Sequence, residues 1–234
     1  MNAVAPTRPL SFSHVTDWVF DLDNTLYPRR CNLFAQIDAL ITTYVMDVTQ
    51  LEYAPARALQ KSYYRDFGTT LNGLMQKHGV DPYHFLQTVH AIDYAPVDPH
   101  PGLVDAIRSL PGRKFIFTNG DEAHATAVLK RLGGAELFDG IFDIHNMGYR
   151  PKPLPEAYDS FLAAHGIDAR GAAMFDDLEK NLKVPHESGM RTVQVVAEPD
   201  FAHAQVEAWE LERTEAEHIH HTTDDLAGFL IRLP

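Results

Sequence analysis

Short apolar runs alternate along most of the chain with stretches in which apolar residues recur every three or four positions. Apolar runs bounded by turn-forming residues are typical of strands covered on both faces, and the longer repeat is typical of helices. The expected strands are residues 17–21, 114–118, 140–144, 172–176, 191–196 and 217–222. The expected helices are residues 102–110, 122–132, 155–165, 179–188 and 224–230. This alternation predicts an α/β fold with a Rossmann-like parallel sheet.

One long segment interrupts the alternation. Residues 28–101 hold no convincing strand, apolar residues between 33 and 48 repeat at helical spacing, and Pro55 fits a second helix start. We therefore expect an all-helical cap inserted directly after the first strand. The expected domains are a core of residues 14–27 and 100–234, and a cap of residues 28–99.

Composition restricts the partners and the compartment. The chain has 234 residues, of which 45% are hydrophobic, so it can bury a sizeable core. Its formal charge of −12 argues against a nucleic-acid polymer as partner, and no apolar run approaches a membrane span. One cysteine, Cys31, and the lack of a signal-peptide pattern in residues 1–13 predict a cytoplasmic protein. The expected oligomeric state is a monomer or a homodimer.

The first expected strand runs into two closely spaced carboxylates. Asp21 and Asp23 follow Val19-Phe20, and Thr25 stands just behind them. Residues two apart on a strand point to the same side, so the carboxylates would repel one another unless a cation lies between them. Mg²⁺ is an oxygen-seeking ion often held by one or two carboxylates plus substrate phosphate. On its own, however, such a pair is more often a capping Asp and a turn Asp after an ordinary strand.

Polar residues also follow the second and fourth expected strands. Thr118, Asn119 and Gly120 come directly before a helix, where backbone amides can face an anion. Asp176-Asp177 ends the fourth strand. Ligand sites of open parallel sheets gather at such carboxyl ends, so these groups are expected to converge on Asp21 and Asp23.

Two further residues complete the pattern. Lys152 lies between Pro151 and Pro153, which stiffen the segment and fix where the lysine points. Asn181 follows Asp177 by four residues. Each signal alone is weak, but the four together, in this order and each at a strand end, indicate a functional site.

The ordered motifs D-x-D-x-T, T-N, K-P and D-D-x-x-x-N resemble those of the haloacid dehalogenase (HAD) superfamily of phosphohydrolases, and the insertion resembles its C1-type helical cap. Three further strings, F-G-T-T-L-N-G-L, V-H-A-I-D-Y and T-N-G-D-E-A-H-A, resemble the pyrimidine 5′-nucleotidase group. The resemblance covers about residues 19–196. It implies an Mg²⁺-dependent phosphomonoesterase that acts through an aspartyl phosphate.

The resemblance also implies roles for the catalytic residues. Asp21 would attack phosphorus, and Asp23 would protonate the leaving alkoxide and then take a proton from water. Thr118 and Asn119 would hold the phosphoryl oxygens, with Gly120 close to the substrate, while Lys152 would neutralise the nucleophile and the phosphate.

The same resemblance implies a metal shell. Asp21, the Asp23 carbonyl and Asp177 would bind Mg²⁺, with Asp176 as a direct or water-mediated helper. Thr25 and Asn181 would support these ligands, although many relatives carry Asp at the position of Asn181.

Substrate selection is expected to lie in the cap. Thr69, Thr70 and Asn72 occupy a polar, glycine-flanked segment expected between helices. They are candidates for contact with a small phosphorylated metabolite, and the resemblance favours UMP or CMP. Nearby Tyr63, Tyr64 and Phe67 fit the cap core better than a base-stacking surface.

Alternatives stay open at this point. They are a phosphatase for another small metabolite such as a sugar phosphate, a sugar phosphomutase, and a phosphate-binding protein without catalysis. Haloacid dehalogenation is disfavoured, because that chemistry needs neither Mg²⁺ nor an acid at Asp23.

The histidines near the C-terminus and His124 each have more than one possible role. His218 and His220 would share one face of a strand, but a cluster at an exposed edge explains them and their neighbour His221 better than a metal site. His124 could reach either the substrate or a neighbouring carbonyl.

Overall fold

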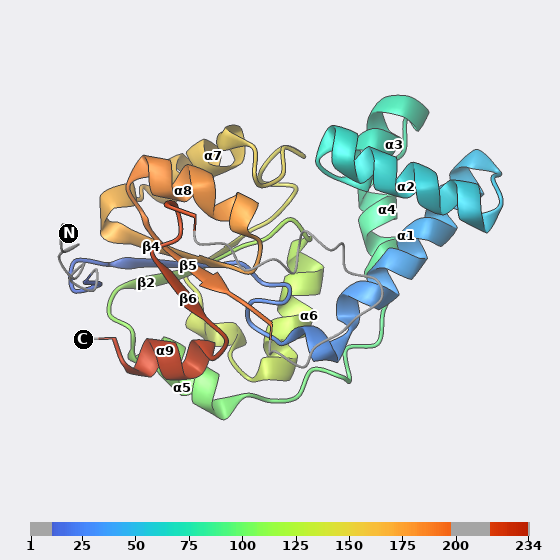
Figure 1. The fold of residues 1–234 in the computed structure, drawn as a ribbon. Helices are drawn as coiled ribbons and strands as arrows, with labels where there is room; N and C mark the ends of the chain where they lie inside the picture. The colour runs from blue at the N-terminus through green and yellow to red at the C-terminus, as the bar shows by residue number, and fades with distance from the viewer. Residues whose placement is uncertain (1–10, 198–215, 234) are drawn as a thin grey trace, which may run out of the picture.

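The computed structural model describes residues 11–197 and 216–233. In this part of the chain six parallel strands form one sheet, in the order β3-β2-β1-β4-β5-β6 (Figure 1). The strands are β1 (Asp17–Phe20), β2 (Arg113–Phe117), β3 (Gly140–Phe142), β4 (Ala172–Asp176), β5 (Arg191–Val195) and β6 (His221–Thr223). The sheet confirms the predicted α/β, Rossmann-like fold class.

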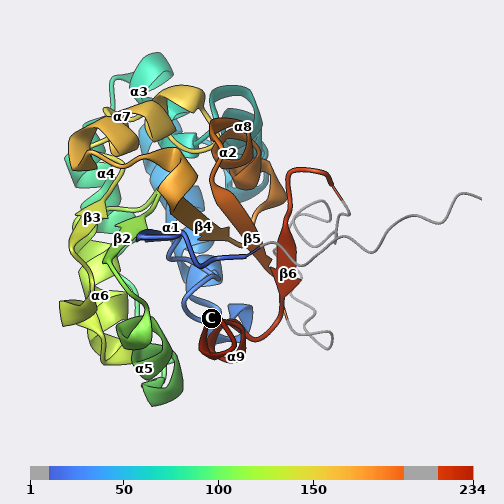
Figure 2. The same ribbon diagram turned by 90° about the vertical axis from the view of Figure 1, so that its left-hand side faces the viewer.

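Helices cover both faces of this sheet. Figures 1 and 2 show α7 and α8 on one face and α5, α6 and α9 on the other. Their bounds are α5 (Pro101–Ser109), α6 (Glu122–Leu132), α7 (Pro155–His165), α8 (Lys183–Ser188) and α9 (Leu226–Ile231). Strand side chains alternate between two hydrophobic cores, so that Trp18 and Phe20 pack with α5 and α6 while Val19 belongs to the core under α7.

Four helices stand together to one side of the sheet domain, joined to it by two connections (Figure 1). They are α1 (Leu33–Thr49), α2 (Tyr53–Phe67), α3 (Thr70–His78) and α4 (Pro82–Val89). Side chains cap two of them: Thr69 Oγ1 accepts the Asn72 amide, and Asp81 accepts the Tyr83 amide. No helix among the described residues is long and apolar enough to cross a bilayer.

The capped start of α3 corrects one expectation. The segment 69–72 was expected to lie between helices, but Thr69 is the N-cap of α3 and Thr70 is its first residue. The threonine that looked like a loop residue is a capping residue, because its hydroxyl satisfies an amide that the first helical turn leaves unpaired.

The helix expected at residues 179–188 is interrupted. The chain forms a 3₁₀ turn, η4 (Glu179–Leu182), and then α8. Pro185 has no N–H with which to bond the Asn181 carbonyl four residues earlier. The Tyr158 hydroxyl donates to that carbonyl instead, at 2.8 Å. The remaining 3₁₀ turns are η1 (Arg29–Cys31), η2 (Ala135–Leu137) and η3 (Ala169–Gly171).

The last strand begins later than expected, at His221 rather than at residue 217. His220 precedes it, and its Nδ1 accepts the Thr192 amide of β5 at 3.1 Å. His218 Nε2 lies 2.8 Å from Glu179 Oε1 instead of beside His220. The histidines therefore belong to the sheet edge, in agreement with the simpler interpretation.

We expect His220 to make folding sensitive to acid. Burial, followed by the nearby charges of His186, Arg191 and His221, lowers the pKa of His220 from 6.5 to about 4. Because the unfolded chain binds this proton more readily, the stabilisation is complete above pH 6.5 and is lost as the pH falls through about 4. Urea unfolding between these pH values should show a shallower pH dependence for His220→Asn than for the wild type. Identical slopes would contradict this assignment.

Candidate active site

The order of the strands places the candidate site at the carboxyl end of β1. The chain fills β2 and β3 on one side of β1 and then crosses to β4 on the other side. At such a switch point the loops diverge and leave a crevice. The polar residues that follow β1, β2 and β4 meet there.

Asp21 is the first residue beyond β1, and its amide still donates to Phe175 O at 2.8 Å. Its carboxylate is therefore fixed relative to the sheet. Oδ1 accepts from Lys152 Nζ at 2.8 Å, and Oδ2 accepts from the Thr25 hydroxyl at 2.9 Å. Lys152 Nζ also lies 2.8 Å from Asp176 Oδ2, so one buried ammonium bridges two carboxylates.

The electrostatics of this group follow from burial. Loss of solvent raises the pKa of Asp21 to about 7, an effect that the Lys152 charge opposes and the Asp176 and Asp23 charges reinforce. Burial alone would lower the pKa of Lys152, but the two carboxylates raise it well above its usual value. Lys152 is therefore held as a cation.

The second acidic pair is held by different partners. Asp176 Oδ1 accepts from the Asn181 side chain at 2.9 Å and from the Leu178 amide at 2.9 Å. Asp177 Oδ2 accepts from Arg29 at 2.6 Å, and both side chains are buried. Asn181 thus holds the Asp176 carboxylate through its side-chain amide.

Asp21, Asp176 and Asp177 offer three carboxylate oxygens within 4.8 Å of one another. They are the single group of potential metal ligands found in the described part of the chain. A buried set of oxygen donors fits a hard cation such as Mg²⁺ better than a softer metal, which prefers sulfur or imidazole. Lys152 and Arg29 balance only part of the negative charge, so the donor set is compatible with one such ion.

The turn after β2 holds the backbone of Lys152 in place and also forms part of the crevice. Asn119 Oδ1 accepts the Lys152 amide at 2.9 Å, and Asn119 Nδ2 donates to the Lys152 carbonyl at 3.0 Å. The Thr118 hydroxyl accepts the Gly120 amide at 3.0 Å, which leaves its own hydrogen for another acceptor. Asn119 is therefore bound to the lysine segment, although it also lines the cavity described below.

Asp23 has partners of its own. Its Oδ1 accepts from the Tyr27 hydroxyl at 2.5 Å and lies 2.7 Å from His124 Nε2. Burial would raise the pKa of Asp23, but the charge and hydrogen bond of His124 and the hydrogen bond from Tyr27 lower it to about 2. Asp23 is thus ionised in the resting protein. His124, which the sequence left undecided, contacts this carboxylate.

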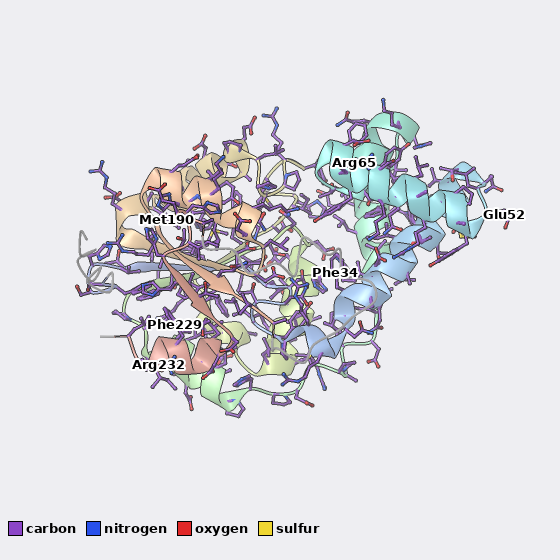
Figure 3. The ribbon with its side chains drawn as sticks, viewed as in Figure 1. Phe34, Glu52, Arg65, Met190, Phe229 and Arg232 are labelled. Carbon is purple, nitrogen blue, oxygen red and sulfur yellow. The ribbon has the colours of Figure 1, made fainter. Side chains whose placement is uncertain are left out.

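A cavity of about 220 Å³ extends from these groups into the cap. Its floor includes Asp21, Asp23, Gly120 and Asp177, whereas α1, α3 and α4 supply apolar walls. Phe34, at the start of α1, lines the cavity with 40% of its surface exposed, and Figure 3 shows it where α1 meets the sheet domain. A large apolar side chain left open at this place is suited to contact with a ligand.

The cap residues expected to touch substrate divide into two groups. Thr69 and Thr70 line the cavity. Asn72 is not among its lining residues, and its side chain donates to the Phe67 carbonyl at 3.3 Å. The Thr70 hydroxyl donates to Gln60 O at 3.2 Å. Asn72 therefore bonds the backbone at the α2–α3 corner and does not line this cavity.

The aromatic residues of α2 also divide. Tyr63 is buried, with its hydroxyl 2.9 Å from His78 Nε2, and it packs edge-on against Phe67. Tyr64 faces the cavity, where its hydroxyl accepts from Lys180 at 3.0 Å. The expected role in the cap core thus fits Tyr63 and Phe67, while Tyr64 joins the cap to the sheet domain.

Comparison with known proteins places this geometry in a family. The model of the haloacid dehalogenase-like hydrolases matches residues 19–189, which include every core motif described above. The chain belongs to this family. The pyrimidine 5′-nucleotidase group within it is not distinguished by the match.

Several relatives of this HAD-like hydrolase are known. Phosphate metabolism protein 8 of Saccharomyces cerevisiae is 27% identical over 189 residues, covering 73% of this chain and 58% of that protein. The chain thus spans little more than half the length of this relative.

Solved structures share the fold at low sequence identity. L-2-haloacid dehalogenase from Xanthobacter autotrophicus has a TM-score of 0.56 at 14% identity, covering 93% of this chain and 97% of the other. The HAD hydrolase YfnB from Bacillus subtilis, bound to magnesium, has a TM-score of 0.55 at 16% identity, with coverage of 94% and 98%. At these identities the likeness concerns the fold.

Sequence reasoning missed several residues of this HAD-like hydrolase site. Arg29 carries no local signal, because its partner Asp177 is 148 residues away. Tyr27 could have been suspected, since it follows Asp23 by only four residues. Phe34 was counted only as part of an apolar helix face.

Lys152 is expected to carry much of the stability of this site. Replacing it by Met leaves Asp21 and Asp176 without their shared cation, which should cost about 3–5 kcal/mol of unfolding free energy. Urea unfolding in chelator should show this loss, and Mg²⁺ should recover part of it. The exposed Lys183→Met variant is the matched control and should behave as wild type. A Lys152→Met protein as stable as the control would contradict the bridging role.

Proposed function

We propose that this HAD-like hydrolase is an Mg²⁺-dependent phosphomonoesterase that acts through an aspartyl phosphate. The observation that carries the proposal is the setting of Asp21. Its carboxylate lines the cavity, lies 2.8 Å from the buried Lys152 ammonium, and has Asp23 two residues away. A nucleophile, a fixed cation and an acid/base group thus share one crevice.

The residues supply the following reaction. An Asp21 oxygen attacks phosphorus, the bond from phosphorus to the ester oxygen breaks, and Asp23 gives the leaving alkoxide a proton. Water then attacks the phosphorus of the aspartyl phosphate and gives a proton to Asp23, releasing phosphate and Asp21. The low pKa of Asp23 keeps its carboxylate ionised before substrate binds, and a bound phosphate places negative charge beside it and favours the protonated form needed for its role as acid.

Other residues position the phosphate and balance charge. Lys152 would offset the charge of Asp21 and of the phosphate, and the Thr118 hydroxyl has a hydrogen to donate to a phosphoryl oxygen. Asp21, Asp177 and the Asp23 carbonyl would hold Mg²⁺, with Asp176 beside them. When bound, the ion would supply positive charge against the phosphoryl oxygens.

Dehalogenation is the competing reaction, since dehalogenases share this fold. Halide removal needs neither a metal nor an acid at the position of Asp23. A buried cluster of three carboxylates is costly without a cation, so its presence favours phosphate chemistry. The name of the yeast relative, phosphate metabolism protein 8, points in the same direction.

We further propose a pyrimidine nucleoside 5′-monophosphate, UMP or CMP, as the substrate. The cavity is at the small end for a ligand pocket, which favours a one-ring over a two-ring base. Phe34 offers an exposed ring on which a planar base can stack, and Thr69 and Thr70 supply polar groups on the cap side. A sugar phosphate remains the alternative substrate class, because it needs no stacking surface.

The reaction is tested by phosphate release from a panel of nucleotides and sugar phosphates. We expect turnover in Mg²⁺, none in chelator, and restoration by added Mg²⁺ but not by Ca²⁺, whose larger shell is looser. Asp21→Asn should abolish turnover while circular dichroism and unfolding show an intact fold. Activity in metal-free buffer, or a folded and active Asn variant, would overturn the assignment.

Substrate choice is tested by kcat/KM. We expect UMP and CMP to exceed AMP and GMP, and Phe34→Ala to lower kcat/KM for UMP by about 10-fold, the equivalent of about 1.4 kcal/mol of stacking. Glycerol phosphate, which has no ring, should be hardly affected. Leu51→Ala removes an equally exposed apolar residue that does not line the cavity, and should change neither. Equal kcat/KM for purines and pyrimidines would reject this substrate and leave the phosphatase standing.

A further inference from the structure

A buried cluster of aromatic and titratable side chains lies behind the acid/base residue and has no role in the reaction described so far. His124 belongs to the first turn of α6, and its side chain is fully buried. Its Nε2 lies 2.7 Å from Asp23 Oδ1, and its Nδ1 lies 3.0 Å from the Tyr94 hydroxyl. Both ring nitrogens are thus engaged, one toward the site and one away from it.

The histidine ring is also fixed from its face. His90 stacks on it, with ring centroids 4.5 Å apart and an interplanar angle of 18°. Asp121 anchors both residues, because its Oδ1 lies 3.0 Å from His90 Nδ1 and accepts the His124 amide at 2.9 Å. The ring can therefore neither flip nor swing without breaking several contacts.

This rigid ring determines how Asp23 is presented. The Tyr27 hydroxyl and His124 both engage Oδ1, so the rotamer of the carboxylate is held at two points. The other oxygen, Oδ2, is turned toward Gly120, 3.8 Å from the position that a Cβ would take there. Gly120 and Asp23 both line the cavity, and the contacts of Tyr27 and His124 are both made with Oδ1, which makes Oδ2 the oxygen available to a leaving group.

We propose that His124 is a positioning residue for the acid/base group. Its Nε2–H donates to Asp23 Oδ1, so that Oδ2 alone exchanges protons with the leaving oxygen and with the hydrolytic water. Tyr94 and His90, from the segment that returns from the cap, hold the ring in place. This inference rests on the phosphatase reaction proposed above, since it assigns a residue that acts through Asp23.

The effect should depend on the leaving group. The alkoxide that leaves from UMP needs a proton as it departs. The nitrophenolate that leaves from a nitrophenyl phosphate departs readily without one. A misplaced Oδ2 therefore slows phosphoenzyme formation from UMP, by about 10²-fold if the displacement is on the order of 1 Å. Formation from the aryl phosphate should change by less than about three-fold. A loss of general packing would slow both substrates alike.

The experiment measures single-turnover phosphoenzyme formation with both substrates. His124→Ala should show the selective loss, and Asp23→Asn should show the same pattern more strongly. His124→Gln, whose side-chain amide can still donate to Oδ1, should recover most of the rate with UMP. A crystal structure of His124→Ala should show the Asp23 carboxylate rotated. His165→Ala, which removes a ring packed against Phe115 in the sheet domain, is the control and should show no selectivity.

The outcomes separate the two proposals. If the wild type hydrolyses no phosphomonoester, the proposed function fails. If the wild type is active and Asp23→Asn is selective, but His124→Ala slows both substrates equally or neither, the positioning role is wrong. If His124→Ala does not fold, Tyr94→Phe, which removes only the hydroxyl beside Nδ1, decides the matter. The Tyr94 hydroxyl contacts both His124 Nδ1 and the His90 carbonyl, so its loss should slow UMP by about 3–10-fold and spare the aryl phosphate; equal slowing would overturn the inference.

Discussion

Repulsion among carboxylates at the end of β1 is the constraint on which the rest of the site depends. Three carboxylate oxygens within 4.8 Å of one another are unstable in a buried place unless cations and donors surround them. Lys152 meets this need for Asp21 and Asp176, and Asn119 fixes the backbone that carries the lysine. The need to offset the charge of these carboxylates thus determines the conformation of the loops after β2 and β3.

Much of this arrangement could be predicted from the sequence because its signals are local. Asp21 and Asp176 each end a short apolar run, and parallel strands bring such ends to one edge of a sheet. The class of the fold follows from the alternation of strands and helices in the same way. The resemblance to the family led us to expect Lys152 beside the nucleophile, and its ammonium lies 2.8 Å from both Asp21 and Asp176.

What the sequence could not supply depends on contacts between distant segments. Arg29 meets Asp177, and His124 meets Asp23 across 101 positions, without any spacing that marks them as partners. Asn72 looked like a substrate contact because it is polar and flanked by glycines, but its amide satisfies a backbone carbonyl at the end of α2. Polarity alone does not distinguish a side chain that serves the backbone from one that faces a ligand.

Arg29 gives Asp177 a positive partner that the polypeptide itself carries. Together with Lys152 it balances part of the negative charge of the site before any ion is present. An ion bound at Asp177 would compete with the Arg29 guanidinium for the same carboxylate, so its uptake would exchange one cation for another. Arg29 also lines the cavity, so its positive charge would remain beside a bound phosphate after such an exchange.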